Sequence, residues 1–125
     1  MQLFPAKTKT KKTQEEAYIE KIQGFIFEDE IIESIHPLFL DFLCITDKRI
    51  IFVDKDLDFT EPTTSIITIP FRNINEVGLV KNDRVFALTD ELVIKTRGGK
   101  YKLKFIKKPD VDIKDIYNNI IRKIL

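Results

Sequence analysis

Hydrophobic side chains form the clearest pattern of the chain in residues 110–124, where they recur at spacings of three and four. This period places them on one face of a helix, and the set comprises Ile113, Ile116, Tyr117, Ile120, Ile121 and Ile124. Aspartates lie at the start of the segment and Arg122 and Lys123 at its end, which is the order that the helix dipole favours. The pattern predicts an amphipathic helix that packs its apolar face against the rest of the domain.

A second helix is predicted to begin at Thr13. Thr13 and Glu16 have the spacing of a capping box, in which each side chain satisfies a backbone N–H at the helix start. An apolar stripe follows, and Gly24 marks its end. Residues 1–12 precede this helix as a basic arm with four lysines and no acidic residue. The arm is either a solvated tail or an electrostatic contact with a partner or a neighbouring subunit.

Between the two helices, the pattern changes to that of strands. Asp47-Lys48 separates two dense apolar runs, which predicts a tight hairpin in which Asp47 bonds its own turn backbone. Because these runs are almost continuously apolar, we expect both of their faces to be covered. Pro70 should end a strand or lie in an edge strand, and Gly78 is a candidate bulge. The predicted strands are 31–36, 40–46, 49–54, 65–71, 74–81, 91–96 and 100–106, with an acidic loop over 54–64.

Lysines occupy every second position of the strand predicted over 100–106. They alternate with Tyr101, Leu103 and Phe105, so one face of the strand is buried and the other carries charge. Together with their neighbours they form a basic set that no acidic residue interrupts: Arg97, Lys100, Lys102, Lys104, Lys107 and Lys108. We interpret this set as a candidate site for an anion or for a partner.

Three interpretations of the basic set stay open. The lysines form a solvated face that protects an edge strand from aggregation, or they meet an acidic surface such as the 54–61 loop of a second copy, or they bind phosphates or anionic lipid headgroups. Nucleic acid is a poor fit, because no exposed aromatic residue is interleaved with these lysines.

Composition narrows the class of protein. The 125 residues suit one domain, and 21 basic against 20 acidic residues give a net charge of +1, so no overall field draws the chain to nucleic acid or membranes. Cys44 is the one cysteine, which excludes an internal disulfide, and its apolar neighbours predict that it is buried. No apolar run reaches the ~18–20 residues of a membrane span, and the first residues do not resemble a signal peptide. We expect a cytoplasmic protein, with peripheral membrane contact as an option.

Catalytic chemistry has no evident residues in this sequence. His36 is the one histidine, so a typical zinc site is not available, and no nucleophile elbow or phosphate-binding glycine loop occurs. We therefore expect a non-enzymatic protein without a metal site or cofactor.

Two short motifs carry a resemblance to a known family. Residues 44–52 (CITDKRIIF) resemble the hairpin of bacterial pleckstrin-homology (PH)-like domains, and residues 69–74 (IPFRNI) are similar to one of their strands. The resemblance covers about residues 28–124 and implies a mainly β, α+β fold: a partly open barrel of two antiparallel sheets capped by the C-terminal helix. We therefore predict a basic arm and N-terminal helix over 1–27 and a PH-like domain over 28–125. Within the motifs we interpret Thr46, Asp47, Lys48, Arg49 and Pro70 as mainly fold-specifying, with Lys48 and Arg49 exposed at the hairpin.

The resemblance implies little about activity. Such bacterial domains are not known as enzymes and often assemble as homo-oligomers, and fold analogy does not transfer the phosphoinositide binding of eukaryotic relatives. The resulting expectation is an interaction module, a self-associating scaffold or adaptor with a protein partner. The alternative is a peripheral binder of anionic lipid headgroups or of a phosphorylated ligand through strand 97–108.

Overall fold

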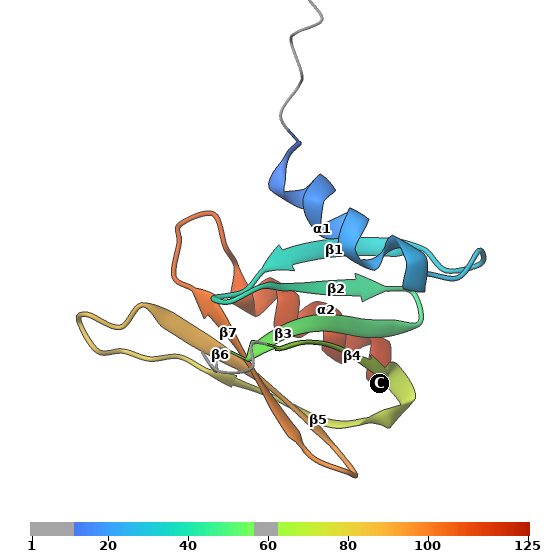
Figure 1. The fold of residues 1–125 in the computed structure, drawn as a ribbon. Helices are drawn as coiled ribbons and strands as arrows, with labels where there is room; N and C mark the ends of the chain where they lie inside the picture. The colour runs from blue at the N-terminus through green and yellow to red at the C-terminus, as the bar shows by residue number, and fades with distance from the viewer. Residues whose placement is uncertain (1–11, 57–62) are drawn as a thin grey trace, which may run out of the picture.

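Seven strands, two helices and two short 3₁₀ turns make up the residues that the computed structural model describes, which are 12–56 and 63–125. The strands form two antiparallel sheets, and each strand pairs with its neighbour in the sequence (Figure 1). The predicted combination of two sheets, an N-terminal helix and a C-terminal helix is confirmed. No strand ladder joins the two sheets within the described residues, so the barrel is open.

The first sheet has the order β1-β2-β3-β4. Its central hairpin turns at Asp47-Lys48 with Ile45 opposite Ile50, as predicted. The last strand is an edge strand that ends at Pro70, also as predicted, and a 3₁₀ turn (Phe71–Asn73) follows. The bounds of the four strands are β1 (Ile32–Pro37), β2 (Phe42–Thr46), β3 (Arg49–Asp56) and β4 (Thr63–Pro70).

The second sheet has the order β5-β6-β7, which makes β7 an edge strand. The prediction of a bulge at Gly78 is wrong, because Gly78 lies in register opposite Val93 and the register shift falls between Ile74 and Glu76. A Cβ at Gly78 would lie 3.6 Å from Cβ of Val93, which is an ordinary van der Waals contact, so packing does not require a glycine there. The bounds are β5 (Ile74–Val80), β6 (Thr89–Thr96) and β7 (Lys100–Ile106).

Helix α2 (Ile113–Ile124) closes the core between the two sheets. Asp112 caps it by accepting hydrogen bonds from the backbone N–H groups of Lys114 and Asp115. Ile113, Ile116 and Ile120 are buried, and the other predicted members of the stripe pack against the same core: Tyr117, Ile121 and Ile124. The prediction that this face docks onto the sheets is confirmed.

Helix α1 (Gln14–Ile22) covers the outer face of the first sheet, with Thr13 and Glu16 forming the predicted capping box. A 3₁₀ turn (Gln23–Phe25) follows it. The Tyr18 ring stacks on Phe42 at a centroid distance of 4.3 Å. All of β2 is consequently buried, since Leu43 and Ile45 face α2 and the second sheet while Phe42 and Cys44 face α1.

Parts of two predictions fall outside the described residues. The arm over residues 1–12 is described only at Lys12, whose ammonium group lies 2.7 Å from the Glu20 carboxylate. The acidic loop predicted over 54–64 is shorter than expected, because β3 continues to Asp56 and β4 begins at Thr63. Residues 57–62 lie outside the described part.

Candidate functional site

The structure places the six predicted basic residues on three separate surfaces. Arg97 lies in the turn between β6 and β7 and lines a cleft of about 360 Å³ with Arg72. The alternating lysines of β7 (Lys100, Lys102 and Lys104) line a second cleft, and the last two members (Lys107 and Lys108) line a third at the other end of the strand. The fold therefore does not gather the six residues into a single site. Ligand binding by any of them stays a prediction.

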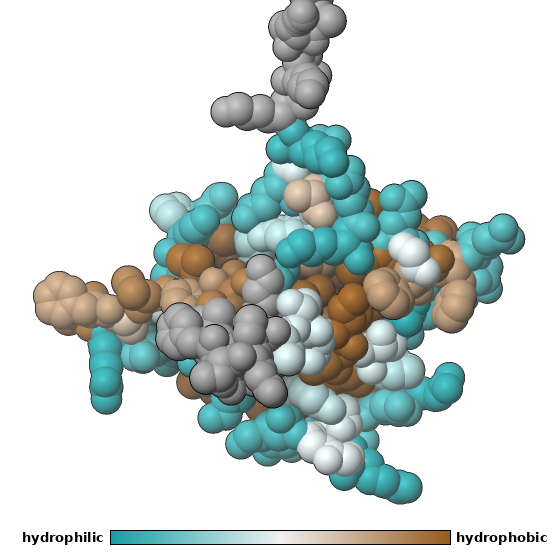
Figure 2. Space-filling view, viewed as in Figure 1, coloured by the Kyte–Doolittle hydropathy of each residue, from teal (hydrophilic) through white to brown (hydrophobic). Residues whose placement is uncertain are grey.

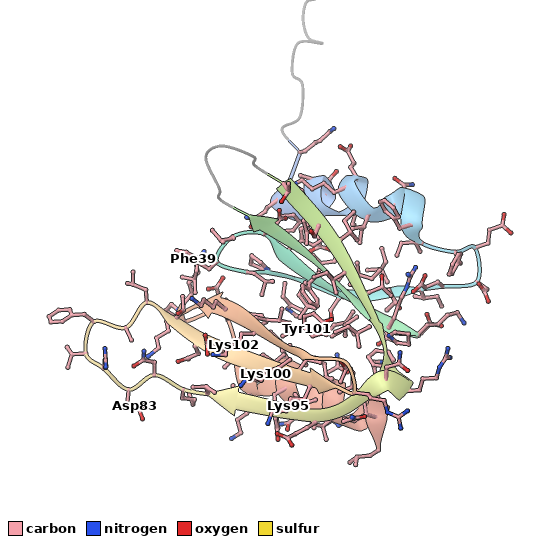
Figure 3. The ribbon with its side chains drawn as sticks, turned by 60° about the horizontal axis from the view of Figure 1, so that its bottom comes forward. Phe39, Asp83, Lys95, Lys100, Tyr101 and Lys102 are labelled. Carbon is pink, nitrogen blue, oxygen red and sulfur yellow. The ribbon has the colours of Figure 1, made fainter. Side chains whose placement is uncertain are left out.

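The β7 lysines lie in rows across the outward face of the second sheet. Lys100 is in register with Lys95 and, through it, with Glu76, whose carboxylate lies 2.9 Å from the Lys95 ammonium. Lys102 lies opposite Val93, an apolar neighbour. Figure 3 shows Lys95, Lys100 and Lys102 along this face, whereas Tyr101 points toward the first sheet. This face carries more positive than negative charge.

The backbone of β7 is open along the side away from β6. The Phe39 N–H donates to the Lys104 carbonyl at 2.8 Å, so the polar groups of Lys104 face away from β6. Alternate residues of an antiparallel edge strand turn their backbone groups to the same side. Lys100 and Lys102 therefore face the same way, and within the described residues no backbone hydrogen bond reaches them on that side. An open edge of this kind is a template for pairing with another strand.

A cleft of about 370 Å³ with an apolar floor runs beside this open edge, and Asp41 and the β7 lysines also line it. Its floor includes Phe52 and Tyr101, whose ring centroids lie 5.6 Å apart in an edge-to-face contact. Its outer wall is the loop between β1 and β2, where Phe39 and Leu40 are exposed by 51% and 43%. The arrangement joins unpaired backbone groups, an apolar cleft and a row of lysines, which suits an extended polypeptide better than a reacting small molecule.

The motif residues at the β2–β3 turn surround a buried ion pair. Nε of Arg49 lies 2.7 Å from Oε2 of Glu30, and its Nη2 lies 2.8 Å from Oε1. The Thr46 hydroxyl donates to Oε2 of Glu30 at 2.7 Å. Hydrogen bonds from Arg49, Thr46 and the Phe27 N–H outweigh burial and lower the pKa of Glu30 to about 2.

This geometry corrects two expectations for the turn. Arg49 is not exposed, because only 14% of its side chain meets solvent, whereas the neighbouring Lys48 is exposed as expected. Contrary to the prediction, the carboxylate of Asp47 does not accept from the backbone of its own turn but from the Ile31 N–H at 2.9 Å. The Thr46 hydroxyl binds the turn instead, by accepting from the N–H groups of Lys48 and Arg49. These contacts link the turn to the segment before β1.

Within residues 12–56 and 63–125, no cluster of three or more His, Cys, Asp or Glu side chains is placed to hold a metal ion. In the same part of the chain, every helix is too short or too polar to cross a bilayer.

Comparison with known proteins assigns the family. The model of the bacterial PH domain family matches residues 6–124. The chain belongs to the bacterial PH domain family. Two uncharacterised Bacillus subtilis relatives of this PH domain are YozO, 30% identical over 78% of this chain and 81% of its own length, and YjqA, 31% identical over 85% and 80%.

Solved structures confirm the PH-like fold. A pleckstrin-homology domain from Shewanella amazonensis superposes with a TM-score of 0.67 at 19% identity, covering 96% of this chain and 95% of that one. A pleckstrin-homology domain protein from Shewanella loihica gives 0.66 at 20% identity, covering 91% and 95%. The family match includes residues 6–27, and the predicted domain boundary after residue 27 stays a prediction.

Two features of this bacterial PH domain were missed from the sequence. The exposed pair Phe39-Leu40 was not assigned to the candidate site, and Leu40 was included in the strand predicted over 40–46, although the apolar run over 38–40 directly after Pro37 is a usable signal. No local pattern indicates that Glu30 is buried, yet its side chain is fully buried against Arg49. The Glu30–Arg49 pair is not visible locally, because the two residues lie 19 positions apart.

Proposed function

We propose that this bacterial PH domain is a protein-interaction module that binds an extended polypeptide segment along the open edge of β7. The observation that supports the proposal most is the coincidence of three features on five consecutive residues, 100–104. These are the outward backbone groups, the apolar cleft and the lysines. Strand addition to a sheet edge uses main-chain hydrogen bonds for affinity and alternate side chains for specificity.

The geometry predicts the sequence pattern of the ligand. Successive side chains of an added strand point to opposite faces. One set would lie over the cleft beside Phe52 and Tyr101, where apolar side chains fit. The other would lie beside Lys100 and Lys102, where carboxylates fit. A segment that alternates apolar and acidic residues is therefore the expected ligand.

The source of this segment decides the biological form of the module. A second copy of the chain would make the module a self-associating scaffold, and a different protein would make it an adaptor. Sedimentation at high micromolar concentration, in low and moderate salt, distinguishes the two forms. Reversible dimers or larger species would assign the segment to a second copy, and a monomer in both salts would assign it to a different protein.

Lys102→Pro tests the open edge directly. Proline removes the outward N–H that an added strand would accept from, and it is tolerated in edge strands where that N–H faces away from the sheet. Lys102→Gln is the matched control, because it removes the charge and keeps the N–H. The probe is a fluorescent peptide that alternates Val and Glu, measured by anisotropy against a scrambled peptide of the same composition.

We expect Lys102→Pro to weaken peptide binding at least tenfold more than Lys102→Gln, with an unchanged melting temperature. In the wild-type protein, the peptide should also protect the Lys102 amide from hydrogen exchange. This second measurement stands even if the proline variant unfolds. The proposal would be refuted if the alternating Val/Glu peptide and its scrambled control bound equally well. It would also be refuted if the Lys102 amide exchanged at the same rate with and without the alternating peptide.

The alternative of anionic-headgroup binding by the whole strand 97–108 has weaker support. The fold separates Arg97 and the last two lysines from the β7 row, so the set does not act as one patch. Of the described surfaces with lysines, the end of the second sheet near Lys107 and Lys108 lies beside the more exposed apolar segment, which contains Val85, Phe86 and Leu88.

A further inference from the structure

The loop between β5 and β6, residues 81–88, carries the most exposed apolar side chains of the described residues apart from Leu125. Val85 is 91% exposed, Phe86 89% and Leu88 72%. The loop protrudes from the body of the protein (Figure 1), and apolar atoms gather at its end (Figure 2). Scattered exposed apolar residues are normal, but a contiguous apolar group marks an interaction site.

Hydrogen bonds hold this loop in its protruding form. The Asn82 N–H donates to the Asp90 carboxylate at 2.9 Å, and the Ala87 N–H donates to the Arg84 carbonyl at 3.1 Å. On the other side, the Lys107 N–H donates to the Leu88 carbonyl at 2.9 Å, and the Lys107 ammonium donates to the Asn82 carbonyl. The fold therefore presents the apolar side chains at the tip.

A cleft of about 400 Å³ next to the loop is lined by four lysines: Lys81, Lys107, Lys108 and Lys114. Two carboxylates also line it, and both are engaged within the protein. Asp90 accepts from Asn82 and lies 3.6 Å from Lys107, and Asp112 caps α2. The other three lysines are exposed and form no ion pair within the described residues. Four lysines against two carboxylates consequently give the lining of the cleft a net positive charge beside the apolar tip.

We infer that this end of the protein binds the surface of an anionic phospholipid bilayer. Val85, Phe86 and Leu88 insert at the boundary between headgroups and acyl chains, and Lys81, Lys108 and Lys114 contact the lipid phosphates. Apolar insertion and attraction of basic residues to anionic lipid are the two terms that hold a protein at a membrane surface. The inference goes beyond the proposed function and does not depend on it.

A bilayer fits this surface better than a protein or a free anion. A standard protein interface buries about 800 Å² on each side, whereas the tip is a narrow projection of three side chains. A small phosphate ligand would use the lysines alone and would leave the apolar tip in water. The basic cleft and the protruding tip together match a layered target, with charge at its surface and hydrocarbon beneath.

The test is flotation with vesicles of phosphatidylcholine and phosphatidylglycerol in equal parts, compared with pure phosphatidylcholine. One variant is Val85→Ser/Phe86→Ser/Leu88→Ser, with Phe25→Ser/Ile31→Ser as the control for exposed apolar residues elsewhere. The other is Lys81→Gln/Lys108→Gln/Lys114→Gln. Its control removes the same charge at exposed residues outside the predicted basic set: Lys48→Gln/Arg72→Gln/Arg122→Gln.

The wild-type protein should float with the anionic vesicles only. The lysine variant should lose roughly a hundredfold in affinity at low salt, since each lysine near an anionic surface contributes about fivefold. The tip variant should lose at least tenfold, and both controls should bind within about twofold of wild type. Phe86→Trp gives an independent readout, because the chain has no Trp. Its emission should shift to the blue and be quenched by brominated lipid.

Three results would overturn the inference. The first is a Phe86→Trp emission that anionic vesicles neither shift nor quench. The second is a tip variant that floats as well as the wild-type protein, combined with complete loss of vesicle binding when inorganic phosphate is added at matched ionic strength. This result would indicate an anion pocket. The third is a tip variant that changes the sedimentation coefficient but not vesicle binding, which would assign the tip to a second copy.

Discussion

Replacement of Arg49 by Met is predicted to leave a buried carboxylate without its cation. The Glu30 side chain is fully buried, and the Arg49 guanidinium supplies two of its hydrogen bonds. Met fills a similar volume without a charge or a donor. Thr46 and the Phe27 N–H remain as donors to the carboxylate. The loss in free energy of unfolding therefore measures the effect of leaving the buried Glu30 carboxylate without a cation.

The magnitude follows from the pKa of Glu30. The lowering from the ordinary value of 4.5 to about 2 corresponds to about 3 kcal/mol at about 1.4 kcal/mol per pH unit. Removal of one partner of a buried pair costs about 3–5 kcal/mol in other proteins. We expect a loss of about 3 kcal/mol at neutral pH, which is a fall in Tm on the order of 12 °C for a domain of this size.

Urea unfolding at several pH values is the assay. In the wild-type protein, the lowered pKa of Glu30 stabilises the fold above pH 4.5, and this contribution is lost as the pH falls toward 2. In Arg49→Met, burial without the guanidinium raises the pKa of Glu30, so protonation of Glu30 relieves the variant as the pH falls. The difference in unfolding free energy between the two proteins should therefore shrink steadily from neutral to acidic pH.

Two further variants make the prediction strict. Lys48→Met removes the adjacent cation, which lies 3.6 Å from Asp29 in an exposed pair, and should cost at most about 0.5 kcal/mol. Glu30→Gln/Arg49→Met removes the orphaned charge and should recover at least about 1 kcal/mol of the loss. The reasoning would be refuted if Arg49→Met cost no more than Lys48→Met, or if its deficit were the same at pH 7 and pH 4.

Three other predictions concern the core. Ile120→Asp places a carboxylate where the side chain is fully buried and should lower the free energy of unfolding by on the order of 4 kcal/mol. The control Asn118→Asp, at an exposed position of the same helix, should change it by less than about 0.5 kcal/mol. A folded Ile120→Asp variant with the wild-type Tm would contradict the docking of α2. Burial raises the pKa of the Cys44 thiol to about 11, so a disulfide reagent should modify the native protein at least about a hundredfold more slowly than the urea-unfolded chain, and equal rates would show that the site is open. Burial also lowers the pKa of His36 below its ordinary value of 6.5, so the unfolded chain binds a proton at a higher pH than the folded protein does. The free energy of unfolding should therefore fall as the pH drops below 6.5. In urea titrations, His36→Gln should make this pH dependence weaker.

Periodicity predicted the elements of this fold because their faces are buried in a regular way. The α2 stripe and the alternation of β7 are repeated local signals, and both elements form close to their predicted bounds. The almost continuous apolar character of β2 likewise predicted burial on both faces, which α1 on one side and the core on the other supply.

The candidate site was less accessible, because it depends on contacts between distant segments. The sequence places six basic residues in one run, but strand geometry and a turn direct them to three clefts. The apolar wall of the β7 cleft comes from a loop more than 60 residues upstream, where Phe39 bonds to Lys104. Arg49 was expected at the surface because its partner, Glu30, belongs to another segment. The hydrophobic pattern predicts no element for residues 82–90, because the exposed apolar side chains at positions 85, 86 and 88 serve no core.

The strictly sequential pairing of the strands has a consequence for the order in which the protein folds during synthesis. Within each sheet, every strand after the first pairs with the strand that was made just before it, so hairpins close over short stretches of chain. Both sheets can pair while the chain is still attached to the ribosome. Their inner faces stay open until residues 113–124 emerge, because α2 contributes Ile113, Ile116 and Ile120 to the core between them. A chain that has stalled before α2 would thus expose two paired but unsealed sheets, which is the form in which chaperones would meet it.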